Sequence, residues 1–527
     1  MMRLLNAVMP GSTRHPCPPQ VAGEVSRAGH GPRIKSGVTR GIITLLVATS
    51  LTACSLAPKY VRPEASVPPS WPVGDAYLKT SEAALPTVRY QDIFRDPRLQ
   101  RIVEQALVNN RDLRIAAANI AAARGQYHIQ RAELLPQVDA SAGYTRSDNG
   151  TARSSTGTGG TVGGGARDSF STSLGITAFE VDLFGRVRSL TTAAQNQYFA
   201  TEAAARATRL TLVGDIADAW LAYASDKSLL KIAEDTATSA GQSVELTRKR
   251  LNGGIAPRTD LRQAELTYDT AKADAAAQKT ALAQDINALQ LLVGAPVDPS
   301  LLPASIDEAG ATLAELPAGL DSSILLRRPD VVEAEYQLRA ANAEIGAARA
   351  ELFPNISLTG LVGLASNALS ALFTGGAFNY SAGANVTYPI FRAGAGKANV
   401  AVSKAQRDAA LATYEKSIQT AFREVSDALA LRGTIGDQLD AQRAQRDAAA
   451  DNYKLSDLRY RGGIDDFLQS LDAQRSLYSA QRTLVTTQLS RASNLVTLYR
   501  TLGGDTLVEA TKAGPMPVGT PTPTPGN

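Results

Sequence analysis

The chain has 527 residues, of which 44% are hydrophobic, 20% charged and only 6% aromatic, so it can fold but has few bulky anchors for a wide core. Its formal charge of +4 comes from the segment before Cys54, which contains six of the 54 Lys/Arg but only one of the 50 Asp/Glu. From Cys54 onward, 48 basic and 49 acidic residues almost balance. A domain that binds nucleic acid carries its positive charge in the folded part, so this balance argues against nucleic acid as a partner.

The first predicted element is a secretion signal over residues 1–53. A short apolar run, 41–51, follows three basic residues, and it is shorter than the roughly 20 residues that a transmembrane helix needs. Residues 1–32 match no part of such a signal, which favours a translation start further along the chain. The run ends near Cys54, and a chain with two cysteines has no disulfide framework.

The sequence LTAC at 51–54 resembles the lipobox of bacterial lipoprotein signals. The resemblance implies that Cys54 carries a diacylglycerol and an N-acyl chain, which anchor the protein to a membrane. A buried, unmodified cysteine is the plain alternative. The residue after Cys54 is Ser55. An Asp at this position would resemble an inner-membrane retention signal, so the serine favours the outer membrane.

The chain is duplicated. RAELLPQVDASAGY (131–144) returns as RAELFPNISLTGLV at a shift of 218, RLNGGIAP matches YRGGIDD at 209, and Phe184 matches Phe391 at 207. The falling shift predicts about 11 extra residues in the first half, within the Gly/Ser/Thr-rich tract 149–165, which reads as an exposed loop. The predicted segments are 54–95 (lipidated N-terminus), 96–295 (first repeat), 296–325 (linker), 326–503 (second repeat) and 504–527 (chain end with a disordered Pro-rich tail).

Each repeat contains a short region in which apolar and polar residues alternate, which predicts strands near 138–145, 169–178, 356–362 and 380–390. A soluble sheet and a membrane barrel give the same alternation, but aromatic residues near both ends of the last strand (Phe378, Tyr380 and Tyr388) favour the membrane. Four strands cannot close a barrel in lipid, where every backbone group needs a partner. Three copies give 12 strands and an open lumen, so we expect a homotrimer.

Long helices follow the strands. Residues 187–250 and 394–460 contain no proline and few glycines, so each helix would be roughly 100 Å long. Return helices are predicted from 257 to 293 and from 466 to 502, with apolar residues spaced for coiled-coil packing. The glycine pairs between them suit tight turns and helix C-caps: Gly253, Gly254, Gly462 and Gly463.

In this order, the motifs CSLAPKYVRPEA, YHIQRAELLP, LLRRPDV, YPIFRAGA and RYRGGIDDFLQSLDAQRSLYSAQ resemble the TolC/OprM-like family of outer-membrane efflux factors, in its lipoprotein (NodT-type) branch. The resemblance covers Cys54 to about Gly504. It implies an α+β membrane protein: a trimer whose 12-stranded transmembrane β-barrel continues into a 12-helix periplasmic α-barrel. Residues near 60–95, the linker 296–325 and the chain end would form a band around the middle of the helices.

The resemblance also implies a function. The protein would be the passive exit duct of a tripartite, RND-type pump for drugs or other small toxic compounds, with a periplasmic adaptor and an inner-membrane transporter as partners. Matching the family's constriction places the gate at Leu468 and Asp472, although Gln469 stands where the TolC type has a second aspartate. Rings of leucine and aspartate would dewet the pore and favour cations. The four turn glycines would meet the adaptor; a packing leucine, a solvated aspartate and plain C-caps are the alternatives.

An enzyme finds little support in the sequence. His128 is the one histidine after Cys54, no nucleophile-elbow motif is present, and TGTGGTVGGG lacks the Lys-Ser/Thr of a phosphate loop. No metal-ligand spacing occurs either, so we expect neither catalysis, nor a metal, nor any cofactor beyond the lipid on Cys54. Two other functions stay open: a type I secretion duct for proteins, and a coiled-coil envelope lipoprotein without a channel.

Overall fold

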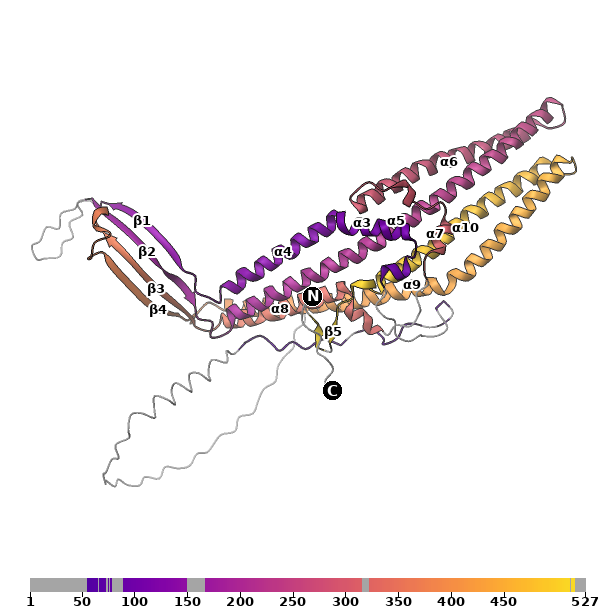
Figure 1. The fold of residues 1–527 in the computed structure, drawn as a ribbon. Coiled ribbons are helices and arrows are strands. Elements are labelled where there is room, and N and C mark those ends of the chain that lie inside the picture. Colours follow the sequence, from indigo (N-terminus) through magenta and orange to yellow (C-terminus); the bar gives the residue numbers. More distant parts are fainter. Residues whose placement is uncertain are drawn as a thin grey trace, which may run out of the picture. The chain divides into compact units, whose positions relative to one another are not determined.

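The computed structural model describes residues 55–64, 66–72, 74, 76–77, 89–148, 166–314, 322–511 and 513–516, all within the unit Cys54–Asn527. The predicted signal, Cys54 itself, the tract 149–165 and the tail beyond Met516 lie outside these residues. Within this unit, Figure 1 shows a small sheet joined to a set of much longer helices.

Three helices of the first repeat have a counterpart in the second. The first repeat contains α3 (Pro97–Asn109), α4 (Arg111–Ala132), α5 (Arg186–Asn252) and α6 (Arg258–Val293); the second contains α8 (Pro329–Ala350), α9 (Ala395–Arg461) and α10 (Phe467–Thr501), which correspond to α4, α5 and α6. Helices α4 and α8 both have 22 residues, and α5 and α9 both have 67. The predicted long helices and return helices are therefore confirmed, to within two residues at each end.

Glycine in the left-handed conformation marks where the long helices begin. Gly185 (φ 76°) precedes α5 and Gly394 (φ 87°) precedes α9, and these two positions are 209 residues apart. The sequence comparison matched Phe184 to Phe391 at a shift of 207, and this match is wrong by two residues. Phe184 stacks on Phe353 with ring centroids 4.7 Å apart, whereas the Phe391 side chain is 87% exposed.

The four strands form one antiparallel sheet in the order β1 (Asp139–Ser147), β2 (Arg167–Glu180), β3 (Asn355–Ser366) and β4 (Phe378–Thr387). Its register places Leu174 opposite Val362, and Val362 opposite Tyr380, so apolar side chains continue from strand to strand. The last strand ends at Thr387, not at Ile390 as the alternation predicted. Pro389 explains the difference, because proline has no N–H to donate to a ladder. Strands β1 and β4 are the two edges of the sheet.

The largest cluster of buried apolar side chains lies where α3, α5, α6 and α10 meet. It contains Trp220, Phe94 and Tyr499, all at most 1% exposed, and the Trp220 indole donates a hydrogen bond to the Leu301 carbonyl oxygen (3.0 Å). Along α6, most of the predicted seam is buried, namely Leu261, Ala264, Ala271, Ala275, Leu282, Leu289 and Val293. Small residues at this seam let α5 approach closely.

Shorter segments pack around these helices. The linker between the repeats contains α7 (Ile306–Ala311), and Glu308 accepts from Arg98 of α3 (2.5 Å). Near the chain end, β5 (Ala510–Thr511) and β6 (Gly514–Pro515) form a small hairpin beside α8. Residues before α2 (Tyr90–Ile93) also contact the second repeat, where Trp71 stacks on Phe422 with centroids 5.0 Å apart.

Candidate functional site

The two turns between outgoing and returning helices are built alike. After α5, Ile255 N–H donates to Arg250 O (2.8 Å) and Gly254 N–H to Leu251 O (3.0 Å); after α9, the corresponding bonds are Ile464 to Arg459 (2.9 Å) and Gly463 to Tyr460 (3.0 Å). These are the paired bonds of the Schellman motif. Gly254 and Gly463 each have φ of 73°, a conformation that side chains with a Cβ adopt at a cost.

Both turns present an isoleucine directly after the glycine pair. Ile255 is 79% exposed and Ile464 is 67% exposed. The predicted turns are thus present at Gly253–Gly254 and Gly462–Gly463, and each exposes one aliphatic side chain at the same place.

The two predicted gate residues lie in the first turns of α10. Leu468 is 58% exposed and Asp472 is also exposed, whereas Phe467 and Leu471 are buried. Because residues four apart share a helix face, Leu468 and Asp472 point away from the packed side of α10 together. Gln469 is exposed beside them, and its backbone N–H is capped by the Asp466 carboxylate (3.2 Å).

A small apolar cluster lies behind these residues and joins the two helix hairpins near their turns: Val244, Leu261, Ala264, Tyr460, Phe467 and Leu471. Tyr460 of α9 contacts α5 in two ways. Its hydroxyl lies 3.3 Å from the Thr247 hydroxyl, and the Arg250 guanidinium lies 4.2 Å from its ring centroid. The turn of each hairpin is therefore held against the other.

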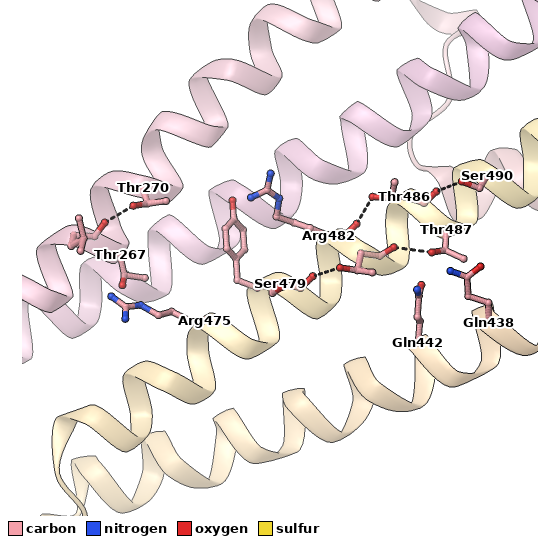
Figure 2. A pocket seen from close by; sticks show the side chains of 13 residues that line it. Thr267, Thr270, Gln438, Gln442, Arg475, Ser479, Arg482, Thr486, Thr487 and Ser490 are labelled. Atoms are coloured by element: carbon pink, nitrogen blue, oxygen red, sulfur yellow. Dashed lines mark hydrogen bonds between the residues drawn. The ribbon is translucent and has the colours of Figure 1, made fainter.

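A polar groove follows the face of α10 that begins at Leu468 and Asp472. Its volume is about 750 Å³, and it lies between α6, α9 and α10 (Figure 2). Helical spacing continues that face through Arg475, Ser479, Arg482, Thr486 and Ser490, which all line the groove. If the gate residues face a duct, this row of arginines and hydroxyls faces it too.

One side of the groove is closed by a link between the hairpins that the sequence did not predict. Asp274 of α6 accepts from the Tyr478 hydroxyl (2.6 Å) and from Arg482 (3.2 Å), both on α10. Burial and the hydrogen bond to Asp274 raise the pKa of Tyr478 to about 12, so the phenol stays a neutral donor. No motif marks this contact, because it depends on how two distant helices are rotated against each other.

The anchor residue Cys54 lies outside the described residues, but the chain directly after it is in place. The Leu56 carbonyl oxygen accepts from Arg349 (2.9 Å), near the end of α8. Helix α8 ends at Ala350, and β3 begins five residues later. The described chain therefore starts beside the junction of helix and sheet.

Signs of catalysis are weak in the described part of the chain. His128 lies exposed on α4, with its ring centroid 5.5 Å from that of its neighbour Tyr127. Among the described residues, no three His, Cys, Asp or Glu side chains are grouped to hold a metal ion. No helix in the described ranges combines the length and apolar character needed to cross a bilayer.

Comparison with known proteins identifies the class. The family model described as "Outer membrane efflux protein" matches residues 102–295 and 320–504. The chain is 44% identical over 470 residues to the probable efflux pump outer membrane protein TtgC of Pseudomonas putida, covering 89% of this chain and 96% of TtgC. It is 40% identical over 464 residues to the outer membrane protein OprJ of Pseudomonas aeruginosa, covering 88% of this chain and 95% of OprJ.

Solved structures agree. A membrane protein from Pseudomonas aeruginosa superposes with a TM-score of 0.78 at 38% identity, covering 85% of this chain and all of that one. The open state of the Neisseria gonorrhoeae MtrE outer membrane channel gives 0.75 at 36% identity, covering 86% and 99%. The chain belongs to the outer membrane efflux protein family, which confirms the resemblance found in its motifs, and it is an efflux protein of the outer membrane.

Proposed function

We propose that this protein is the exit duct of a tripartite, RND-type pump, and that it passively exports small toxic compounds delivered by an inner-membrane transporter and a periplasmic adaptor. Similarity supports the substrate class: among the relatives are a toluene efflux pump protein and an antibiotic efflux pump protein of Pseudomonas putida, both 44% identical. Both names refer to small molecules rather than to secreted proteins. A small-molecule duct is therefore the first candidate function, and a type I secretion duct for proteins is the second.

The observation that carries the proposal is the open sheet. Strands β1 and β4 each pair on one side only, while apolar side chains on them are exposed, including Tyr144 (57%), Phe378 (62%), Tyr380 (77%) and Val386 (61%). In hydrocarbon an unpaired edge is costly, so β4 of one copy would pair with β1 of the next. Eight strands would leave an interior filled by side chains, whereas three copies give 12 strands and a lumen.

The helices next to the sheet edges support the same assembly. Helix α4, which leads into β1, has no buried residue, although Ile115 is 56% and Ile129 is 69% exposed. Helix α9, which follows β4, leaves Val402 52% exposed. A neighbouring copy would cover these faces, so that the trimer carries a ring of 12 helices below its strands.

The site residues take their roles from this assembly. Leu468 and Asp472 would form rings at the constriction, because both lie on the exposed face of α10 and three copies would bring three of each together. The turns Gly253–Gly254 and Gly462–Gly463, with Ile255 and Ile464, would meet the adaptor. Cys54 would carry the diacylglycerol and N-acyl chains, with no other cofactor and no catalysis.

The first experiment measures accumulation of a fluorescent efflux dye in cells that lack this gene, with and without the gene restored. Accumulation that falls on restoration supports a small-molecule duct. No difference would favour protein export, and the secreted proteins would be compared next. An absence of ion conductance in planar bilayers, even after Leu468 and Asp472 are replaced by alanine, would instead support a coiled-coil lipoprotein without a channel.

A further inference from the structure

The first described residues, 55–64, lie antiparallel to α8, and we call this segment the N-terminal strap. Arg349 donates to the Leu56 carbonyl oxygen (2.9 Å), and Asn342 donates to the Pro58 carbonyl oxygen (2.8 Å). Two backbone carbonyls of the strap are thus bound by side chains two helical turns apart. Contacts of this kind fix the position of the strap along the helix.

A glycine lets the strap approach α8 closely. Gly346 is buried between Arg349 and Asn342, and a Cβ built on it would lie 2.7 Å from the Ala57 Cβ and 2.9 Å from the Ala57 Cα. A larger residue at position 346 would also meet the Ser189 Oγ of α5 (2.7 Å), whereas a larger residue at position 57 would push the strap itself away from α8. The close approach depends on a glycine of α8 that faces an alanine of the strap.

The far end of the strap is held by a buried carboxylate. Glu335 of α8 is 0% exposed, and it accepts from the Tyr60 hydroxyl (3.2 Å), from Arg62 (2.7 Å) and from Arg339 (3.0 Å). Arg339 also donates to the Ala513 carbonyl oxygen (2.7 Å), so the same cluster holds the chain end. A buried acid needs such partners, because its desolvation is otherwise uncompensated.

We propose that Glu335, Asn342, Gly346 and Arg349 form a docking track, the α8 track, which holds the strap so that Cys54 stays beside the helix–sheet junction. The proposal rests on the proposed lipid at Cys54 and assigns these four as its positioning residues. Leu56, whose carbonyl is bound, is only two positions after Cys54, and this stretch of chain spans about 7 Å at most. The acyl chains would therefore enter the membrane at one fixed place next to the sheet, not at the end of a long free linker.

Trypsin tests this directly on the full-length protein purified in detergent. Within the strap only the bond after Lys59 is a good trypsin site, because Arg62 is followed by Pro63. A docked strap resists cleavage, since a protease must bind an extended, released segment. Cleavage there releases the peptide that begins at Cys54, and its mass reports the lipid separately.

Two variants separate docking from general damage. Ala57→Leu should speed cleavage after Lys59 by about tenfold or more, because its side chain has no room against Gly346. Val61→Leu is the matched control: it also enlarges an aliphatic side chain, but Val61 is 75% exposed, so the rate should stay as in the unmodified chain. Cys54→Ser should leave the protection intact.

Rapid cleavage of the unmodified chain, or equal rates for it and Ala57→Leu, would overturn the α8 track. A protected strap whose released peptide lacks acyl mass would retain the track and remove the lipid proposal instead. Glu335→Gln provides a second test, because it should speed the same cleavage while Glu344→Gln, an exposed change on the same helix, does not.

Discussion

The Asp285 carboxyl group on α6 lies beside the Asp226 carboxyl group on α5, and its buried Oδ2 atom has no hydrogen-bond partner among the described residues, so two acids meet inside the first helix hairpin. Burial is the main cause that raises the pKa of Asp285 to about 6, and the negative charge of the nearby Asp226 is the second. Burial also raises the pKa of Asp226. Burial, and to a lesser extent the nearby Asp285 carboxylate, raise the pKa of Tyr223 as well. Of the acids on α7, Glu308 pairs with Arg98 and Asp307 with Gln488.

This pair should make the protein less stable as the pH rises. A raised pKa means that the folded state binds the proton more strongly than the unfolded state, so the stabilisation is complete below 3.8 and is lost as the pH rises to about 6. Asp285→Asn should remove this loss, which we expect to be on the order of 1 kcal/mol because the pair is partly exposed. Thermal unfolding between pH 4 and 7 measures it; parallel curves for the two proteins would contradict the prediction.

Replacing Leu468 and Asp472 together by alanine should widen the proposed constriction. We expect a higher conductance in planar bilayers and greater sensitivity of cells to large antibiotics, because both the proposed leucine ring and the proposed aspartate ring would be lost. Asp451 and Leu455 of α9 are a matched control pair, since they are also four residues apart and exposed. Unchanged conductance in the α10 variant, or an equal rise in the control, would remove these residues from the gate.

Alanine at Gly254 or Gly463 should destabilise the turns by about 1–2 kcal/mol each, because a residue with a Cβ is strained at φ of 73°. The space around both positions is open, so the backbone conformation alone sets this cost. Gly253→Ala is the control, since its φ of −81° is accessible to any residue. Thermal unfolding of the three variants compares them, and equal midpoints for Gly253→Ala and Gly254→Ala would refute the argument.

Glu335→Gln should lower the free energy of unfolding by about 3 kcal/mol, because it leaves the Arg62 and Arg339 guanidinium groups without their buried counter-charge. Thermal unfolding in detergent is the measurement. Glu344→Gln on the same helix should have almost no effect, as its side chain is exposed. A loss below about 1 kcal/mol would mean that water enters and solvates the cluster.

Cys54→Ser should abolish the acyl mass of the mature protein but retain part of the efflux, because the strands proposed to lie in the membrane also hold the protein there. Mass spectrometry and dye accumulation check the two halves of this prediction. Cys17→Ser, in the predicted signal, should change neither. Complete loss of the proposed folded trimer in Cys54→Ser would show that the lipid is needed for assembly.

The sequence predicted what depends on local pattern. Uninterrupted stretches without proline marked α5 and α9, and glycine pairs marked both turns, because these features are decided within a few residues. The alternation of apolar and polar residues predicted the strands but extended the last one to Ile390, whereas β4 ends at Thr387, just before Pro389. The links of Asp274 to Tyr478 and of Glu335 to Arg62 were not predictable, since they join residues 204 and 273 positions apart and depend on helix rotation and on a strap without regular structure.

The equal lengths of α5 and α9 restrict how this protein can evolve. Both have 67 residues and both start after a left-handed glycine and end in the same turn, although their sequences have diverged. An insertion in one alone would displace its turn by about 1.5 Å per residue and rotate every later contact by about 100°. The length can therefore change only by matching insertions or deletions in all four long helices at once. This explains why the two halves of the duplicated chain still have long helices of equal length.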